Sequence, residues 1–280
     1  MTDAPAGQPP VQGALPLYKS PEPINVQSHK ALGVKYSDKP FEFLAETHFS
    51  PVTLGEFAPA STRYPVIFLG DNKTPVAAMG LRQGENVFVD PKTFEFERYA
   101  YLPAYVRRYP FVAATHREQK DRFTVCVDTA SPVVTENADQ PFFTEDGQPS
   151  EFLNRAIDFV RRFEGDVNAT ETFVAKMNEL DLFDQQQATF QPRDEQGQPV
   201  GEPQVVASYW AISGDKLKAV SPEVLAELRD NTYLAAIYAH MMSLANWDMV
   251  INRVMARQNA GQDGSNRIAP QSDIAPPPEG

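Results

Sequence analysis

The chain has 280 residues, of which 42% are hydrophobic and 22% are charged, proportions usual for a globular protein with a buried core. Its formal net charge of −12 and its pI near 4.8 exclude a protein that holds nucleic acid by neutralising phosphates, and they disfavour adsorption to an anionic membrane. No stretch approaches the roughly 18 apolar residues of a membrane-spanning helix, so we expect no membrane-spanning segment.

Both ends of the sequence are rich in Pro, Gly and small polar residues and show no apolar periodicity. This composition predicts disordered tails over 1–20 and 259–280, on either side of a single domain over 21–258. The first residues also lack the basic and apolar segments of a secretory signal. The expected location is therefore the cytoplasm, with the cell surface left open through a non-classical export route.

The first half of the domain is predicted to form an antiparallel sheet. A short helix is expected before the sheet, within 52–65, where Pro59 weakens the helical pattern. Apolar runs separated by turn residues then predict strands, and the last two of these runs are joined near Lys120. The expected strands are Tyr64–Gly70, Pro75–Leu81, Asn86–Asp90, Pro110–Glu118 and Asp121–Ala130.

The second half is predicted to be mainly helical. Ser150 is a suitable cap for an amphipathic helix over Glu151–Phe163, and Gly165 is expected to end it. The other expected elements are a helix over Glu171–Phe183, a hairpin over Ala188–Ser213 with its turn at 193–201, a helix that begins at Ser221-Pro222, and the longest helix over Asn231–Gln258. The fold class is therefore α+β, with an antiparallel sheet from the N-terminal half packed with C-terminal helices.

Motifs for cofactors and metals are missing from the sequence. There is no phosphate-binding or dinucleotide-binding glycine loop, no pair of cysteines and no GxSxG turn. None of the histidines, His29, His48, His116 and His240, stands in a spacing typical of a metal site. We therefore expect no cofactor and no metal.

Two adjacent arginines, Arg107 and Arg108, stand in the apolar segment "YLPAYVRRYPFVAA". A guanidinium group can hold a carboxylate or a phosphate through two parallel hydrogen bonds, and it stacks on aromatic rings. One interpretation is a clamp for an anionic ligand. The other is a structural role in which the arginines pair with the chain's own carboxylates, at Glu56, Glu85 or Asp90. The candidate ligand-binding residues are His29, Glu56, Arg63, Arg82, Tyr105, Arg107 and Arg108.

Three other polar residues have a structural interpretation beside the functional one. The single cysteine, Cys126, lies in the apolar run "RFTVCVDTA" and is expected to be buried rather than nucleophilic. His240 lies beside the apolar stripe of the longest predicted helix and is expected at the edge of the core. His29 is expected to form local hydrogen bonds, with a ligand or acid–base role as the alternative.

In chain order, a set of segments resembles the SapC family of bacterial proteins, over roughly Pro23–Arg257. The most specific segments are "RYPVIF" and "PAYVRRYPF". The others are "PINVQSHKALGV", "PVAAMGLRQGENVFVD", "FTVCVDTAS", "PFFTEDGQPS" and "YLAAIYAHMMSLANWDMVI".

This resemblance implies an association with the bacterial cell envelope or surface layer, and it supplies no catalytic residues. It implies an accessory or binding protein, more readily than an enzyme, that recognises a peptide or a small anionic ligand. The alternative is an enzyme or enzyme partner that modifies peptides or aromatic compounds beside halogenase-like or cupin-like proteins, with Arg107 or Arg108 as clamp and Glu56 or His29 as acid or base. TonB-dependent receptors are further partners that the resemblance implies.

Overall fold

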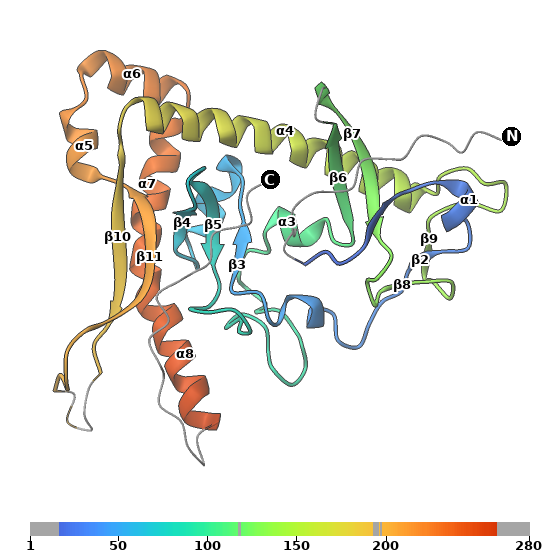
Figure 1. Ribbon diagram of the computed structural model, residues 1–280, viewed down its shortest axis with the longest axis horizontal. Helices are drawn as coiled ribbons and strands as arrows, with labels where there is room; N and C mark the ends of the chain where they lie inside the picture. The colour runs from blue at the N-terminus through green and yellow to red at the C-terminus, as the bar shows by residue number, and fades with distance from the viewer. Residues whose placement is uncertain (1–16, 117–118, 193–195, 197, 262–280) are drawn as a thin grey trace, which may run out of the picture. The chain divides into compact units, whose positions relative to one another are not determined.

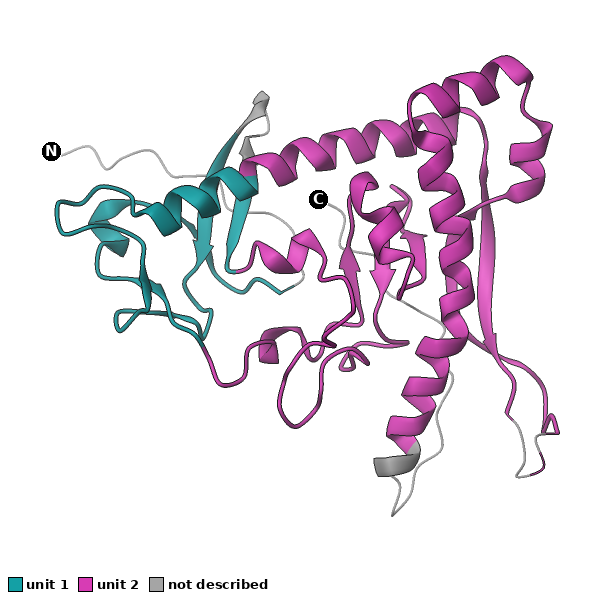
Figure 2. Cartoon of the chain, turned by 180° about the vertical axis from the view of Figure 1, so that it is seen from behind, with its two compact units in different colours: residues 1–36, 110–160, 277–280 teal, residues 37–109, 161–276 magenta. Residues whose placement is uncertain are grey.

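The computed structural model describes residues 17–116, 119–192, 196 and 198–261 (Figure 1). Contacts divide the chain into two compact units (Figure 2). Unit 1 comprises residues 1–36, 110–160 and 277–280, and unit 2 comprises residues 37–109 and 161–276. The single folding domain expected over 21–258 stays a prediction. The expected tails lie mostly outside the described residues.

Unit 1 contains two small antiparallel sheets, with strand orders β1-β7-β6 and β8-β2-β9. Its core is formed by aromatic and aliphatic side chains such as Phe111, Phe142 and Leu153. The elements are β1 (Pro21–Pro23), α1 (Val26–His29), β2 (Gly33–Val34), β6 (Phe111–His116), β7 (Gln119–Asp128), β8 (Val134–Thr135), β9 (Gln140–Pro141) and the first turns of α4 (Glu151–Glu179).

Unit 2 is built on a five-stranded antiparallel sheet of order β10-β11-β4-β5-β3. Helix α7 packs along β11, and α8 follows it in the chain (Figure 1). The elements are η1 (Glu42–Leu44), β3 (Phe49–Pro51), η2 (Leu54–Glu56), α2 (Phe57–Ala60), β4 (Val66–Leu69), β5 (Thr74–Ala78), α3 (Ala104–Arg107), the later turns of α4, β10 (Phe183–Phe190), β11 (Gln204–Ile212), α5 (Gly214–Ala219), α6 (Pro222–Asp230), α7 (Tyr233–Ser243), η3 (Leu244–Asn246) and α8 (Trp247–Gly261).

The predicted α+β class is confirmed, and so are most of its elements. Strands β4, β5, β6 and β7 form where the sequence predicts them. The hairpin is also present as β10 and β11, but β10 begins at Phe183, five residues before the predicted start at Ala188. The cap at Ser221 is also confirmed, because its hydroxyl accepts a hydrogen bond from the Val224 amide at 3.3 Å. Part of the hairpin turn, at 193–195 and 197, lies outside the described residues, as do 117 and 118 at the end of the expected strand Pro110–Glu118.

The strand predicted over Asn86–Asp90 is wrong. The segment forms turns, in which the buried Asn86 side chain accepts from the Phe88 amide at 2.9 Å and donates to the Leu44 carbonyl at 3.2 Å. These side-chain hydrogen bonds, one local and one to a residue distant in the sequence, replace those of a strand ladder. Strand β3, which the sequence did not predict, pairs with β5 instead.

The helix boundaries predicted in the second half are also wrong. Gly165 does not end a helix, because the chain continues through it as the 29-residue helix α4, which is longer than the helix expected over Asn231–Gln258. A glycine inside a helix costs only about 1 kcal/mol, and buried side chains on both sides, Phe163 and Phe173, offset that cost. The helix expected over Asn231–Gln258 is interrupted by the 3-10 turn η3, which separates α7 from α8.

Candidate functional site

Arg108 is buried inside unit 2. Its guanidinium carbon lies 4.4 Å from the ring centroids of both Tyr105 and Phe163, and its Nη1 lies 3.3 Å from Oε1 of Glu164 on α4. The partner is thus a carboxylate that the sequence analysis did not consider. Burial raises the pKa of Glu164, and the neighbouring guanidinium lowers it in part. The arrangement ties α3 to α4 and places the Arg108 cation among the protein's own groups.

Glu56 and Arg107 are connected through Tyr101. The buried Glu56 carboxylate accepts from the Thr53 amide and hydroxyl at 2.8 and 3.0 Å, from the Tyr101 hydroxyl at 3.0 Å and from the Ala104 amide at 2.6 Å. The Tyr101 hydroxyl also accepts from Nη2 of the exposed Arg107 at 3.1 Å. These four bonds to Glu56 fix the loop that leads into α3, so Glu56 anchors the segment that carries the two arginines.

Arg63 and Arg82 lie in separate surface ion pairs. Arg63 is 4.0 Å from Glu97, a carboxylate that also pairs with Arg253 of α8. Arg82 is 3.9 Å from Glu85. Pairs of this exposed kind contribute little to stability, and they do not point at one shared centre. The structure therefore joins Arg108 with Tyr105, and Arg107 with Glu56, and leaves Arg63 and Arg82 apart.

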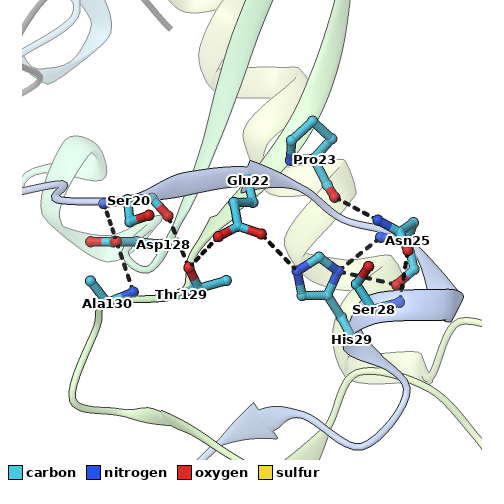
Figure 3. Close-up of polar contacts among 9 residues, drawn as sticks. All are labelled: Ser20, Glu22, Pro23, Asn25, Ser28, His29, Asp128, Thr129 and Ala130. Carbon is cyan, nitrogen blue, oxygen red and sulfur yellow. Dashed lines mark hydrogen bonds and ion pairs between the residues drawn. The ribbon is translucent and has the colours of Figure 1, made fainter. Parts of the chain in front are cut away.

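His29 belongs to unit 1, where it lies in a polar cluster between β1 and the end of β7 (Figure 3). Its Nδ1 is 3.2 Å from the Asn25 amide nitrogen, and its Nε2 is 3.9 Å from Oε2 of Glu22. The other carboxylate oxygen of Glu22 accepts from the Thr129 hydroxyl at 2.8 Å. Because Asn25 also caps α1 through the Ser28 amide, the local interpretation of His29 is the one the geometry favours.

Asp128 completes this cluster by holding the incoming chain. Its buried carboxylate accepts from the Lys19 amide at 3.0 Å. It also accepts from the amides of Ser20 and Ala130 at 2.7 and 3.3 Å (Figure 3). The chain is thus already anchored before β1, within the segment that the sequence assigned to a disordered tail. All the donors in this part of the cluster are backbone amides, as in a structural anchor.

A groove with a volume of about 760 Å³ lies in unit 2, at the place where strand β4 ends beside β11. None of the residues predicted from the sequence lines it. Its walls combine hydrogen-bonding side chains with an aromatic surface. The lining residues are Phe68, Leu69, Gly70, Asp71, Gln185, Gln186, Gln187, Thr189, Ser208, Tyr209 and Trp210.

The groove exists because β4 is shorter than β11. The two strands share one registered pair, Phe68 with Trp210, and two residues later β4 turns away at Gly70, whose φ is +69°. Beyond this point β11 continues away from β4 towards its first residue, Gln204. Among the described residues, no further strand pairs with that edge.

Backbone groups of β11 face the groove. The Ile212 amide donates to Nε2 of His240, whose Nδ1 lies 2.7 Å from the Val66 carbonyl, so the backbone of Ile212 faces β4. Alternate residues of a strand present their amide and carbonyl to the same side, so those of Trp210 and Ser208 face β4 as well. Ser208 therefore offers main-chain as well as side-chain partners where β4 has turned away.

The groove is rich in neutral hydrogen-bonding groups. Gln185 and Gln187, two residues apart on β10, are both exposed, and each amide side chain can donate and accept. Trp210 forms the aromatic surface, with the ammonium of Lys73 at 4.8 Å from its ring centroid. Asp71 is the one carboxylate among the lining residues. This set suits a polar, uncharged ligand better than a strongly anionic one.

Sequence reasoning missed the groove for a physical reason. The run "QQQ" falls between the helix expected over Glu171–Phe183 and the hairpin expected over Ala188–Ser213, and "DNKT" has the composition of a turn between two strands. A signal was present, because three consecutive glutamines are unusual where β-branched residues are preferred. Only the register between β4 and β11 shows that these segments lie together.

Within the part of the chain that the structure describes, there is neither a candidate metal site nor a candidate membrane-spanning helix. No group of three or more His, Cys, Asp or Glu residues is placed to hold a metal ion there. In those same residues, no helix has the length and apolarity needed to span a membrane. Cys126 is buried as expected, and burial raises the pKa of its thiol to about 11.

Comparison with known proteins gives one result. No curated protein and no solved structure matches the chain. The model of the SapC family matches residues 24–250, which include both "RYPVIF" and "PAYVRRYPF". Since this match covers well over half of the chain, the protein belongs to the SapC family.

Proposed function

We propose that this protein is a non-catalytic accessory protein of the bacterial cell envelope, and that it binds an extended, uncharged peptide segment in the groove between β4 and β11. The observation that carries the proposal is the lining of the groove. Amide side chains of Gln185 and Gln187 can pair with peptide groups through both a donor and an acceptor, and Trp210 offers an apolar face.

The arginines are less suited to bind an anionic ligand than the groove is to bind a peptide. Arg108 pairs with Glu164 and stacks between two rings, so an anion would have to compete with contacts already made. Leaving Glu164 without its cation in a partly buried place would cost further free energy. A peptide in the groove needs no such exchange.

The test is a selection of random dodecapeptides against three purified proteins. Gln187→Trp fills the groove with a larger side chain, and Gln204→Trp makes the same change at an exposed position of β11 outside the lining. We expect peptides that bind the wild type and Gln204→Trp but lose at least about tenfold in affinity for Gln187→Trp. Selected peptides that bind both variants equally would place binding elsewhere, and no enrichment at all would remove the proposal.

The association with the envelope is a separate part of the proposal, and it is based on the family. Fractionation of the native host, with immunodetection of the protein in cytoplasmic, membrane and surface-extract fractions, tests it directly. Recovery only in the cytoplasmic fraction would contradict the envelope role while leaving peptide binding intact.

A further inference from the structure

The outer side of helix α7 exposes large apolar side chains. Met242 is 75% exposed and Tyr238 is 51% exposed, and Ala235 is exposed too, as is Ala245 in the 3-10 turn η3 that directly follows α7. These four positions follow one another at steps of three, four and three residues, so they form one stripe that runs along α7 and into η3. We call this stripe the α7 face. Figures 1 and 2 show α7 running beside the β10–β11 hairpin. The buried side chains of α7, such as Ile237, belong to the core of unit 2.

The α7 face lies in the longest uncharged stretch of the chain. From Asn231 to Trp247 there is no Asp, Glu, Lys or Arg, in a chain whose net charge is −12. The exposed side of α4, by contrast, carries charged residues such as Arg155, Asp158 and Arg162. The solvent-facing side of a helix normally carries charged residues, as α4 does. An exposed apolar surface commonly marks a contact with another molecule.

The face is complementary to itself. When two copies of α7 are placed antiparallel about a two-fold axis at the level of residue 240, Ala235 comes opposite Ala245 and Tyr238 comes opposite Met242. Small residues thus meet small residues, which lets the helices approach, and a flexible thioether meets an aromatic ring on either side of the axis. A two-fold interface requires this kind of matching of one surface with itself.

We propose that the α7 face is the contact surface for a second copy of this chain, packed antiparallel so that Tyr238 of one copy lies against Met242 of the other. Charge supports this occupant over a lipid surface. Two copies that each have a net charge of −12 repel each other least where their facing surfaces carry no charge. An anionic bilayer would repel the same protein.

The expected dimer is weak. One face of an eleven-residue helix buries well below the roughly 800 Å² per partner of a stable complex. We therefore expect a dissociation constant between about 10 µM and 1 mM, so that the dimer forms at high local concentration. The α7 face shares no residue with the groove, so the two proposals can fail separately.

The decisive experiment is sedimentation velocity of the full chain over a concentration series, with charge-swap variants. Met242→Glu and Tyr238→Lys should each weaken self-association at least about tenfold. An equimolar mixture of the two variants should recover it, because the ammonium introduced in one copy then faces the carboxylate introduced in the other. Tyr99→Lys is the matched control, since Tyr99 is 77% exposed and lies outside the α7 face.

A cysteine pair reports the orientation. In the antiparallel arrangement, Ala235→Cys mixed with Ala245→Cys should form disulfide-linked dimers faster than either variant alone when dissolved oxygen is supplied as the oxidant. The native Cys126 is buried and does not compete. Three results would each overturn the proposal. The wild-type chain could stay monomeric up to about 1 mM, or Met242→Glu and Tyr238→Lys could weaken association no more than Tyr99→Lys does. The third such result is that mixing Met242→Glu with Tyr238→Lys fails to restore association. If the wild-type chain does not self-associate but binds vesicles of neutral phosphatidylcholine, and if Met242→Glu abolishes that binding, the α7 face is a lipid-binding surface instead.

Discussion

Replacing Arg108 with alanine tests whether this buried cation holds unit 2 together. The change removes two cation–π contacts, to Tyr105 and Phe163, each about 0.5–2 kcal/mol. It also leaves Glu164 without its ionic partner. Breaking a fully buried pair costs about 3–5 kcal/mol, and the 21% exposure of the Glu164 side chain reduces that figure. We expect a total loss of about 3 kcal/mol, or a melting temperature lower by roughly 6–12 °C.

The assay is thermal and urea unfolding of the protein without ligand, followed by circular dichroism. Arg107→Ala is the matched control, because the neighbouring Arg107 side chain is exposed and its loss should cost less than about 1 kcal/mol. The two substitutions are at adjacent positions, so any effect of alanine on the local backbone is similar in both variants. It therefore cancels when their free energies of unfolding are compared.

The Arg108→Ala variant should also depend on pH in a defined direction. Burial raises the pKa of Glu164 and Arg108 opposes that rise, so the pKa of Glu164 rises further in the variant. A carboxyl whose pKa is higher in the folded than in the unfolded state destabilises the fold when it is ionised. The cost of the substitution should therefore shrink as the pH falls from 7 towards 5. This reasoning would be refuted if Arg108→Ala lowered the free energy of unfolding no more than Arg107→Ala does. It would also be refuted if the loss in Arg108→Ala did not change with pH.

Three further predictions concern single buried positions. Burial lowers the pKa of His240 to about 4, so wild-type stability should fall by up to ~3 kcal/mol as the pH drops from about 6.5 to 4, and urea titrations should show a smaller fall in His240→Leu. Cys126→Ser should cost about 1–2 kcal/mol by burying a hydroxyl, and native Cys126 should react slowly with a thiol reagent; rapid labelling would contradict its burial. Gly33→Ala should cost at least about 2 kcal/mol in a thermal melt, because the added Cβ would lie 2.3 Å from the Gln140 carbonyl oxygen, whereas Gly55→Ala, with open space around it, should be nearly neutral.

Much of the secondary structure could be predicted from local patterns. Apolar runs bounded by turn residues identified β4 and β5, and the Ser221-Pro222 pair located the start of α6. The errors have a common origin, since packing overrode a local signal in each. Gly165 is tolerated inside α4 by the burial of Phe163 and Phe173. The Asn86 side chain turns a strand-like segment through one hydrogen bond to the nearby Phe88 amide and one to the carbonyl of Leu44, which it meets only in the fold.

The sequence identified polar residues in apolar surroundings, but none of them lines the groove. Arg108 and Glu56 were among them, and both are buried and engaged. The partner of Arg108 could not be inferred, because Glu164 is more than fifty residues from it along the chain. The groove was missed altogether, since it depends on where β4 stops relative to β11.

By itself, the sequence determined the α+β class, the family and the burial of Cys126. These properties follow from composition and short-range periodicity, which each segment carries alone. Only the tertiary structure decided that the cation at Arg108 is neutralised internally, that amides and a tryptophan gather beside the end of β4, and that Tyr238 and Met242 remain uncovered on α7. Pairing, register and exposure are relations between distant residues, and folding creates them.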